Sequence, residues 1–249
     1  MIRIALSVSL LVTAVSTASA DVSLTLPQKK LALSVAVQTD GDATGLAPDL
    51  AVGVTDKLTV AIVHSTQNAT GFWSGSGTGS LCITGDACGD LYTGGALLAK
   101  LGLASTPSFA FAALGGVIHN IAAERSGLGA GFEALYLAGP VGVHFKPTIY
   151  IGLDDRDAMA PNREYINAPL SLLVPATKTL QLGVQSGVAG PAEGFGDAYR
   201  IPVGAMGNYA FGAGMSAQLA FNLDRVAGGG EMASATDARS VTLTVGWVK

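Results

Sequence analysis

Histidine and cysteine side chains are the first candidates for chemistry, and the chain has three histidines and two cysteines. His64 adjoins Ser65, but neighbouring residues on a strand point to opposite faces, so they cannot act together as base and nucleophile. His119 falls at a predicted loop edge, and His144 is two residues from Lys146 on a predicted strand. The chain also lacks the G-x-S-x-G, G-x-x-x-x-G-K-[ST], G-x-G-x-x-G and H-E-x-x-H motifs. We therefore expect no catalytic residues and no cofactor.

The two cysteines, Cys82 and Cys88, are close together in the stretch LCITGDACGD. Close cysteines in an exported chain are typical of a disulfide, and the first twenty residues of this chain predict export. A metal site is the alternative, with Asp86 and Asp90 as nearby carboxylates, but no regular calcium-ligand spacing supports it. We expect a disulfide and no bound metal.

The start of the chain has the three parts of a signal peptide. A short basic start at 1–3 is followed by an apolar run at 4–15 and by Ala18-Ser19-Ala20, a small-x-small cleavage site. A membrane anchor is the alternative, but the run is shorter than the roughly 18 residues that a spanning helix needs. We expect residues 1–20 to be removed and residues 21–249 to form one domain.

The composition is unusually apolar for an exported protein. It is 49% hydrophobic and 13% charged, whereas soluble domains average about 25% charged residues. After the signal peptide, no segment approaches the length of a spanning helix. The apolar surface must therefore be buried in a large sandwich core or face lipid, where only helices and closed barrels satisfy every backbone amide.

Period-two alternation of apolar and polar residues predicts twelve strands. It is weakest at 92–102 and 109–118, where alanine, glycine and leucine fall on both faces. The predicted strands are 30–38, 49–54, 58–65, 92–102, 109–118, 128–138, 141–153, 167–175, 179–189, 200–211, 215–225 and 239–248.

The links between these strands alternate between short and long. The short links are 55–57, 103–108, 139–140, 176–178 and 212–214, and the long links are 39–48, 66–91, 119–127, 154–166, 190–199 and 226–238. Short turns at one end and long loops at the other are typical of an antiparallel up-and-down transmembrane β-barrel, with the turns on the periplasmic side. A Greek-key sandwich is not expected to sort its links in this way.

Three of the short turns predict a strand register in which apolar residues meet apolar residues, and the Gly139-Pro140 turn also sets Glu133 opposite Lys146. The predicted apolar pairs are Ala138 with Val141, Tyr136 with Val143, Ala134 with Phe145, Val54 with Leu58, Val52 with Val60, Leu50 with Ile62, Val174 with Leu180 and Leu172 with Leu182.

In a barrel the apolar face meets lipid, and the face rich in glycine, alanine and polar residues lines the lumen. Four aromatic residues of the apolar face, Tyr136, Tyr209, Phe211 and Trp247, are near the short turns, as expected at a membrane boundary. A sandwich would instead use them as core aromatics. The residues predicted to line the lumen are Asp49, Lys100, Glu133, His144, Lys146, Gln181, Gln185, Asn222 and Asp224.

Charges inside a pore tune its selectivity, but Glu133 and Lys146 could equally satisfy each other and block passage. Thirteen of the eighteen acidic residues fall in the long links. They could concentrate cations at a mouth or serve only loop solubility. Nothing in the chain is basic enough to suggest nucleic acid.

The signal sequence, the twelve alternating segments, the sorted links and the ending SVTLTVGWVK together resemble bacterial outer-membrane β-barrel proteins in the broad, porin-like sense. These barrels usually finish on an aromatic residue, whereas here Trp247 is followed by two more residues. The resemblance implies the outer membrane of a Gram-negative bacterium, with lipid, lipopolysaccharide and small solutes as partners. We expect a passive channel for small solutes. The alternatives are a closed structural or adhesion barrel displaying its loops, and an exported soluble β-sandwich that binds a ligand.

Overall fold

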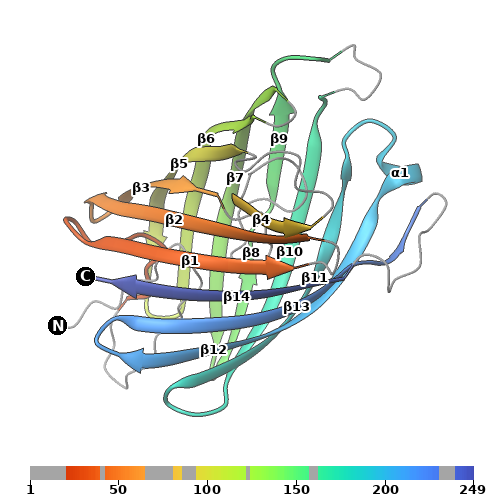
Figure 1. The fold of residues 1–249 in the computed structure, drawn as a ribbon. Coiled ribbons are helices and arrows are strands. Elements are labelled where there is room, and N and C mark those ends of the chain that lie inside the picture. The colour runs from red at the N-terminus through yellow and green to blue at the C-terminus, as the bar shows by residue number, and fades with distance from the viewer. Residues whose placement is uncertain are drawn as a thin grey trace.

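The computed structural model describes residues 21–39, 43–64, 81–85, 94–121, 124–156, 162–229 and 239–249. The predicted signal peptide, residues 1–20, lies outside the described residues. The described chain is almost entirely β-strand and closes into one antiparallel barrel (Figure 1). The barrel closes because β1 (Leu31–Thr39) pairs with both β2 (Ala43–Thr55) and β14 (Arg239–Val248).

The predicted twelve-stranded barrel is confirmed, and the sandwich alternative is wrong. Apart from β1, β2 and β14, the wall contains β3 (Leu58–Val63), β5 (Gly94–Ser105), β6 (Phe109–Asn120), β7 (Arg125–Ala138), β8 (Val141–Phe145), β9 (Thr148–Gly152), β10 (Tyr165–Pro175), β11 (Leu180–Pro191), β12 (Arg200–Gly212) and β13 (Met215–Gly228). β8 and β9 together make one of the twelve strands. Between β11 and β12 lies the four-residue helix α1 (Phe195–Ala198), and no helix in the described ranges is long and apolar enough to cross a bilayer.

The break between β8 and β9 departs from the single predicted strand 141–153. It falls at Lys146-Pro147, because proline has no N–H to give to the sheet. The Pro147 carbonyl still accepts a hydrogen bond from the Phe132 N–H at 3.1 Å. The register with β7 resumes at Thr148 without an offset. The interruption is therefore local, and the strand continues through it.

At the end of the barrel with the long loops, the first long link is shorter than predicted. β2 begins at Ala43 instead of residue 49, so only residues 40–42 separate it from β1. A short strand that was not predicted, β4 (Leu81–Gly85), pairs with the start of β2. β2 therefore has β4 beside its first residues and β3 beside its last.

The register is confirmed at one predicted turn, partly confirmed at a second and wrong at the third. At Gly139-Pro140 the structure pairs Ala138 with Val141 as predicted. In the β2–β3 hairpin a bulge after Gly53 sets Thr55, instead of Val54, opposite Leu58, and the other two predicted pairs are correct. In the β10–β11 hairpin Val174 faces Leu182 instead of Leu180. A shift of two residues keeps every side chain on its predicted face.

Polarity across the wall is the reverse of that in a soluble protein. On β13 and β14 the outward Leu219 is 57% exposed, whereas the inward Thr242 is 1% exposed. Large apolar residues point outward on every side of the barrel, and hydrocarbon is the surrounding that such a surface requires. Near the short turns, Tyr209 and Phe211 pack edge to face with ring centroids 4.9 Å apart, as expected of a boundary aromatic belt.

Candidate functional site

One half of the inner wall carries uncharged polar side chains in rows across the strands. We name the inner faces of β10–β14 the amide half. Its first row, the amide row, consists of Gln181, Asn208, Gln218 and Thr244, which are successive register partners on β11, β12, β13 and β14. The Asn208 side-chain amide donates a hydrogen bond of 3.4 Å to the Gln181 carbonyl oxygen. Four adjacent strands thus present a continuous track of hydrogen-bonding groups.

A second row runs across the same strands from Ser171 through Gln185 and Asn222 to Ser240. Ser171 donates a hydrogen bond of 3.5 Å to Gln185. Between Gln185 and Asn222 the register position on β12 is Gly204, and a Cβ there would lie 2.1 Å from the Asn222 side-chain oxygen. The glycine therefore leaves the space that the asparagine side chain occupies.

The other half of the wall, the inner faces of β1–β6, is mainly aliphatic, with Asp49, Thr59 and Lys100 as buried polar residues, and we name it the alanine half. Its middle row joins Ala32, Ala51, Ala61 and Leu98 as register partners on β1, β2, β3 and β5. All four are buried in one apolar cluster. Water gains no hydrogen bonds from the side chains of this row, so a polar solute is expected to follow the amide half instead.

A charged group joins the two halves, and we name Lys100, Glu133, His144 and Lys146 the charge cluster. The Lys100 ammonium lies 2.6 Å from the Glu133 carboxylate, and the Lys146 ammonium lies 4.0 Å from it. His144 Nε2 lies 2.9 Å from the other Glu133 oxygen. All four side chains are almost fully buried. One carboxylate thus holds two lysines and a histidine, an arrangement that buried charges require.

The charge cluster contains a contact that the sequence did not reveal. Lys146 is opposite Glu133 as predicted, but Lys100 of β5 is closer to the carboxylate. β6 lies between β5 and β7, and its Ala112 is the register partner of Glu133, whereas Lys100 is the partner of Leu114. The small alanine side chain leaves room for the lysine and the glutamate to meet across an intervening strand.

The predicted lumen residues fall into two groups. Eight of them are buried on the inner wall: Asp49, Lys100, Glu133, His144, Lys146, Gln181, Gln185 and Asn222. Asp224, the ninth, is only half-buried and lies where β13 nears its long-loop end. The inner wall also contains polar residues that were not predicted: Thr59, Thr148, Asn167, Ser171, Asn208, Ser216, Gln218, Ser240, Thr242 and Thr244. The alternation of the predicted strands, continued across these positions, was the signal that could have found them.

The largest feature that the prediction missed is the segment of residues 21–30, which we name the N-terminal segment. It lies inside the short-turn end of the barrel. Leu24 packs with Ala110, Ala112 and Leu135, and Leu26 packs against the alanine row. Burying two leucine side chains stabilises this position by roughly 1.5–3 kcal/mol each.

Backbone and side-chain hydrogen bonds fix the N-terminal segment to two short turns. The Val22 N–H donates to the Thr106 carbonyl at 3.0 Å, beside the β5–β6 turn. Next to the β2–β3 turn, the Leu26 N–H donates to the Thr59 hydroxyl at 2.8 Å. Thr25 donates from its hydroxyl to the Asp56 carbonyl at 2.9 Å. The segment therefore lies along the alanine half at this end of the lumen.

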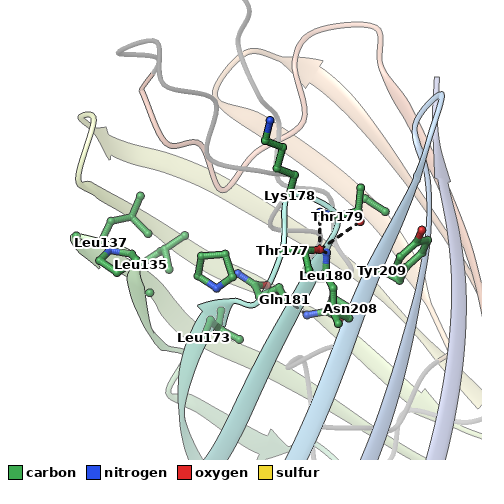
Figure 2. Close-up of a pocket in the computed structure, with 15 residues that line it drawn as sticks. Leu135, Leu137, Leu173, Thr177, Lys178, Thr179, Leu180, Gln181, Asn208 and Tyr209 are labelled. Atoms are coloured by element: carbon green, nitrogen blue, oxygen red, sulfur yellow. Dashed lines mark hydrogen bonds between the residues drawn. The ribbon is translucent and has the colours of Figure 1, made fainter.

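Two pockets lie at the short-turn end: one of about 30 Å³ on the side of the amide half (Figure 2), and one of about 520 Å³ between the N-terminal segment and the β2–β3 and β5–β6 turns. Figure 2 shows Gln181 and Asn208 side by side in the smaller pocket, with Leu173 nearby, while Lys178 extends away from it. A water molecule needs roughly 15 Å³ of such space. The smaller pocket therefore admits water and is smaller than a sugar, whereas the larger pocket is bounded by the N-terminal segment.

At the long-loop end, a hydrogen-bond network ties the link after β9 to β7. The Asp154 carboxylate accepts from the Ser126 N–H at 2.8 Å and from the Asn162 side-chain amide at 2.7 Å. The Ser126 hydrogen bond is the main cause that lowers the pKa of Asp154 below its ordinary value. A hydrogen bond from Arg156 likewise lowers the pKa of Glu164. These carboxylates hold loops in place in addition to giving the rim its charge.

The structure also shows a serine beside a histidine. His119 Nδ1 lies 3.0 Å from the Ser126 hydroxyl, because the two are register partners on β6 and β7. Nucleophilic catalysis also requires a group that orients the imidazole. Within the described ranges, no hydrogen bond to the other ring nitrogen of His119 is present. The pair alone does not make a hydrolase site.

Cys82 lies in β4, and its predicted disulfide partner Cys88 lies outside the described residues, so the disulfide stays a prediction. Asp86 and Asp90 also lie outside them. Among the residues that the structure describes, no group of three or more histidine, cysteine, aspartate or glutamate side chains is placed to hold a metal ion.

Solved structures that share this fold are outer-membrane porins and channels. The NanC porin matches with a TM-score of 0.60 at 5% identity, over 88% of this chain and 98% of the other. The KdgM porin matches with a TM-score of 0.61 at 6% identity, over 87% and 98%. An outer-membrane channel from Pseudomonas putida F1 matches with a TM-score of 0.57 at 14% identity, over 90% and 97%.

No protein-family model and no curated protein sequence matches the chain. Identities this low establish the fold alone. The chain thus has the twelve-stranded barrel architecture of outer-membrane porins, and the predicted resemblance is confirmed at that level.

Proposed function

We propose that the protein is a narrow passive channel for small polar solutes. In this proposal it is exported after loss of residues 1–20 and resides in the outer membrane of a Gram-negative bacterium, where its apolar outer face contacts lipid and lipopolysaccharide. The observation that carries the proposal is the amide half, two rows of hydrogen-bonding side chains across adjacent strands of a closed barrel, with the apolar Leu173, Met206 and Ala220 between the rows. A barrel that served only as an anchor needs no such rows.

The solutes we propose are uncharged. The described inner wall combines Lys100 and Lys146 with Glu133 and Asp49, two basic and two acidic side chains. The amide half offers amides and hydroxyls, which donate and accept hydrogen bonds without preference for ionic charge. A KdgM porin has been solved in complex with disordered oligogalacturonate, which supports binding of small solutes by barrels of this shape.

Single-channel recording of the purified protein in planar bilayers tests the proposal. We expect small, steady conductance steps and a reversal potential near zero in a salt gradient, because the described inner wall carries two basic and two acidic side chains. The same sample should migrate differently on gels before and after boiling, which verifies that the barrel is folded. Folded protein without conductance would contradict the channel.

A closed barrel that displays its loops is the second candidate, and one observation favours it. The polar residues buried on the inner wall are at most 7% exposed, so little space remains beside them. A closed barrel predicts that folded protein never conducts, whereas its loops bind a surface partner.

The long link after β3 adds a separate proposal, that Cys82 and Cys88 form a disulfide. It rests on their spacing in an exported chain and not on the described structure. Peptide mass mapping with and without reductant tests it: a linked pair is expected, and two alkylated cysteines without reduction would contradict it.

A further inference from the structure

The N-terminal segment occupies the short-turn mouth of the barrel, and this inference rests on the proposed channel function. We infer that residues 21–30 are the size filter of the channel. The segment covers the alanine half at this end, with Leu26 fully buried and Leu24 nearly so. The segment itself bounds the pocket of about 520 Å³ at this end, through Leu24, Thr25 and Pro27, and the smaller pocket lies beside Gln181 and Asn208. The dimensions of the pathway therefore depend on a part of the chain that precedes the first strand.

The wall is shaped to receive the N-terminal segment. Gly53 has no side chain where the segment passes, and a Cβ there would lie 2.0 Å from the Pro27 carbonyl oxygen. Thr59, an inward polar residue whose register partners are Gly53 and Lys100, uses its hydroxyl to accept the Leu26 N–H. A buried polar group needs such a partner. The Thr59 hydroxyl therefore serves to bind the segment and not to contact a solute in the lumen. The segment is thus a built part of the inner wall.

The N-terminal segment is held at both of its ends. Beyond Val22 the Ser105 hydroxyl donates to the Val22 carbonyl at 2.7 Å. At the other end the Lys29 N–H donates to the Gly53 carbonyl at 2.8 Å, and the Gly53 N–H donates to the Lys30 carbonyl at 2.9 Å. The segment then leads directly into β1. These attachments describe a fixed constriction and not a gate that leaves the lumen during conduction.

The first experiment deletes residues 22–28 from the otherwise complete chain and records single channels of this variant. Because conductance grows with pore cross-section, we expect at least about a twofold rise. In liposome swelling the deletion variant should admit larger neutral solutes than the wild type. Heat-modifiable migration verifies that the barrel still folds.

A point variant tests the same inference if the deletion does not fold. In Gly53→Ala the new methyl group collides with the Pro27 carbonyl, so the segment must leave its position. The matched control is Gly207→Ala, where the nearest atom to the new methyl group is 3.7 Å away, on Leu182. Gly53→Ala should raise the conductance, whereas Gly207→Ala should leave it at the wild-type value.

A cross-link separates a fixed filter from a gate. In the double variant Thr25→Cys with Gly102→Cys, the new Cβ at residue 102 lies 3.5 Å from the Thr25 Cγ2 position, within reach of a disulfide. The oxidised protein should conduct as the wild type does. A lower conductance when oxidised would show that current flows only with the segment displaced, which overturns the filter. Thr25→Cys alone serves as the control.

The remaining outcomes separate the two proposals. If the wild type conducts and neither the deletion nor Gly53→Ala changes the conductance, the filter is overturned and the channel stands. If the wild type is silent and the deletion conducts, the segment closes the pathway, which supports its role at the mouth and overturns the open channel. If every folded form is silent, both proposals are overturned.

Discussion

The amide half and the alanine half of the inner wall are built on the same strand geometry and differ in what covers them. Both consist of register rows across adjacent antiparallel strands. The alanine row is covered by the N-terminal segment, which buries Leu26 against it. The amide row has no such cover from the segment, and its Gln181 and Asn208 line the pocket of about 30 Å³. The comparison shows how one barrel assigns part of its inner wall to packing and the rest to passage.

The largest expected effect comes from removing the carboxylate that joins the halves. Glu133→Gln leaves Lys100 and Lys146 buried without their anion, and breaking a buried pair costs roughly 3–5 kcal/mol of the free energy of unfolding. Gln181→Leu in the amide half should cost less than about 1 kcal/mol, since its one weak hydrogen bond is modest in net energy. Urea unfolding followed by heat-modifiable migration measures both. Equal losses of the free energy of unfolding in the two variants would show that the charge cluster does not hold the two halves together.

Leu26→Ala tests the packing role of the alanine half. Truncating a fully buried leucine removes roughly 2–4 kcal/mol from the docking of the N-terminal segment. Hydrogen exchange should therefore quicken at the Val22 and Leu26 amides while β1 stays protected. If the exchange rates do not change, the segment is not held by this leucine.

Thr244→Val probes the amide half with a smaller expected effect. Among the described residues no protein group bonds the Thr244 hydroxyl, although the residue is 3% exposed. Because valine has nearly the same shape, the free energy of unfolding should change by less than about 1 kcal/mol. A larger loss, again by urea unfolding, would show that the hydroxyl has a strong protein partner and serves packing, as the alanine half does.

The smallest effect concerns Asp154, which lies outside both halves. The folded pKa of this carboxyl is below its ordinary value of 3.8, so its stabilisation is complete above that value and is lost as the pH falls through the lowered pKa. Hydrogen exchange of the Ser126 amide should be slower in the wild type than in Asp154→Asn at pH 6. This difference in exchange rate should vanish at a pH below the lowered pKa of Asp154. A difference that persists there would contradict the assigned hydrogen bonds.

The sequence predicted the barrel well because a strand with one lipid face must alternate, and alternation survives a register error of two residues. The Gly139-Pro140 turn was predicted correctly because two residues leave one way to pair Ala138 with Val141. The β10–β11 turn was not, since the Thr177 hydroxyl accepts the Leu180 N–H and lengthens the turn. Such local side-chain bonding is not evident from polarity.

The N-terminal segment was missed for a different reason. Val22, Leu24 and Leu26 alternate as a short strand does, which was the available signal. The segment's partners are far along the chain, for example Thr59 for Leu26 and Thr106 for Val22. Its place becomes evident only once β3 pairs with β5, because that pairing brings the β2–β3 and β5–β6 turns side by side.

Thiol labelling during single-channel recording tests most directly whether the amide half is the pathway. Asn208→Cys places a thiol in the amide row, and Ala61→Cys places one in the covered alanine row. A negatively charged, water-soluble thiol reagent should reduce the current through Asn208→Cys and leave Ala61→Cys and the wild type unchanged. The contrary results are that the reagent reduces the current through Ala61→Cys alone, or through both variants equally. Either result would contradict the claim that solutes pass along the amide half and not along the alanine half.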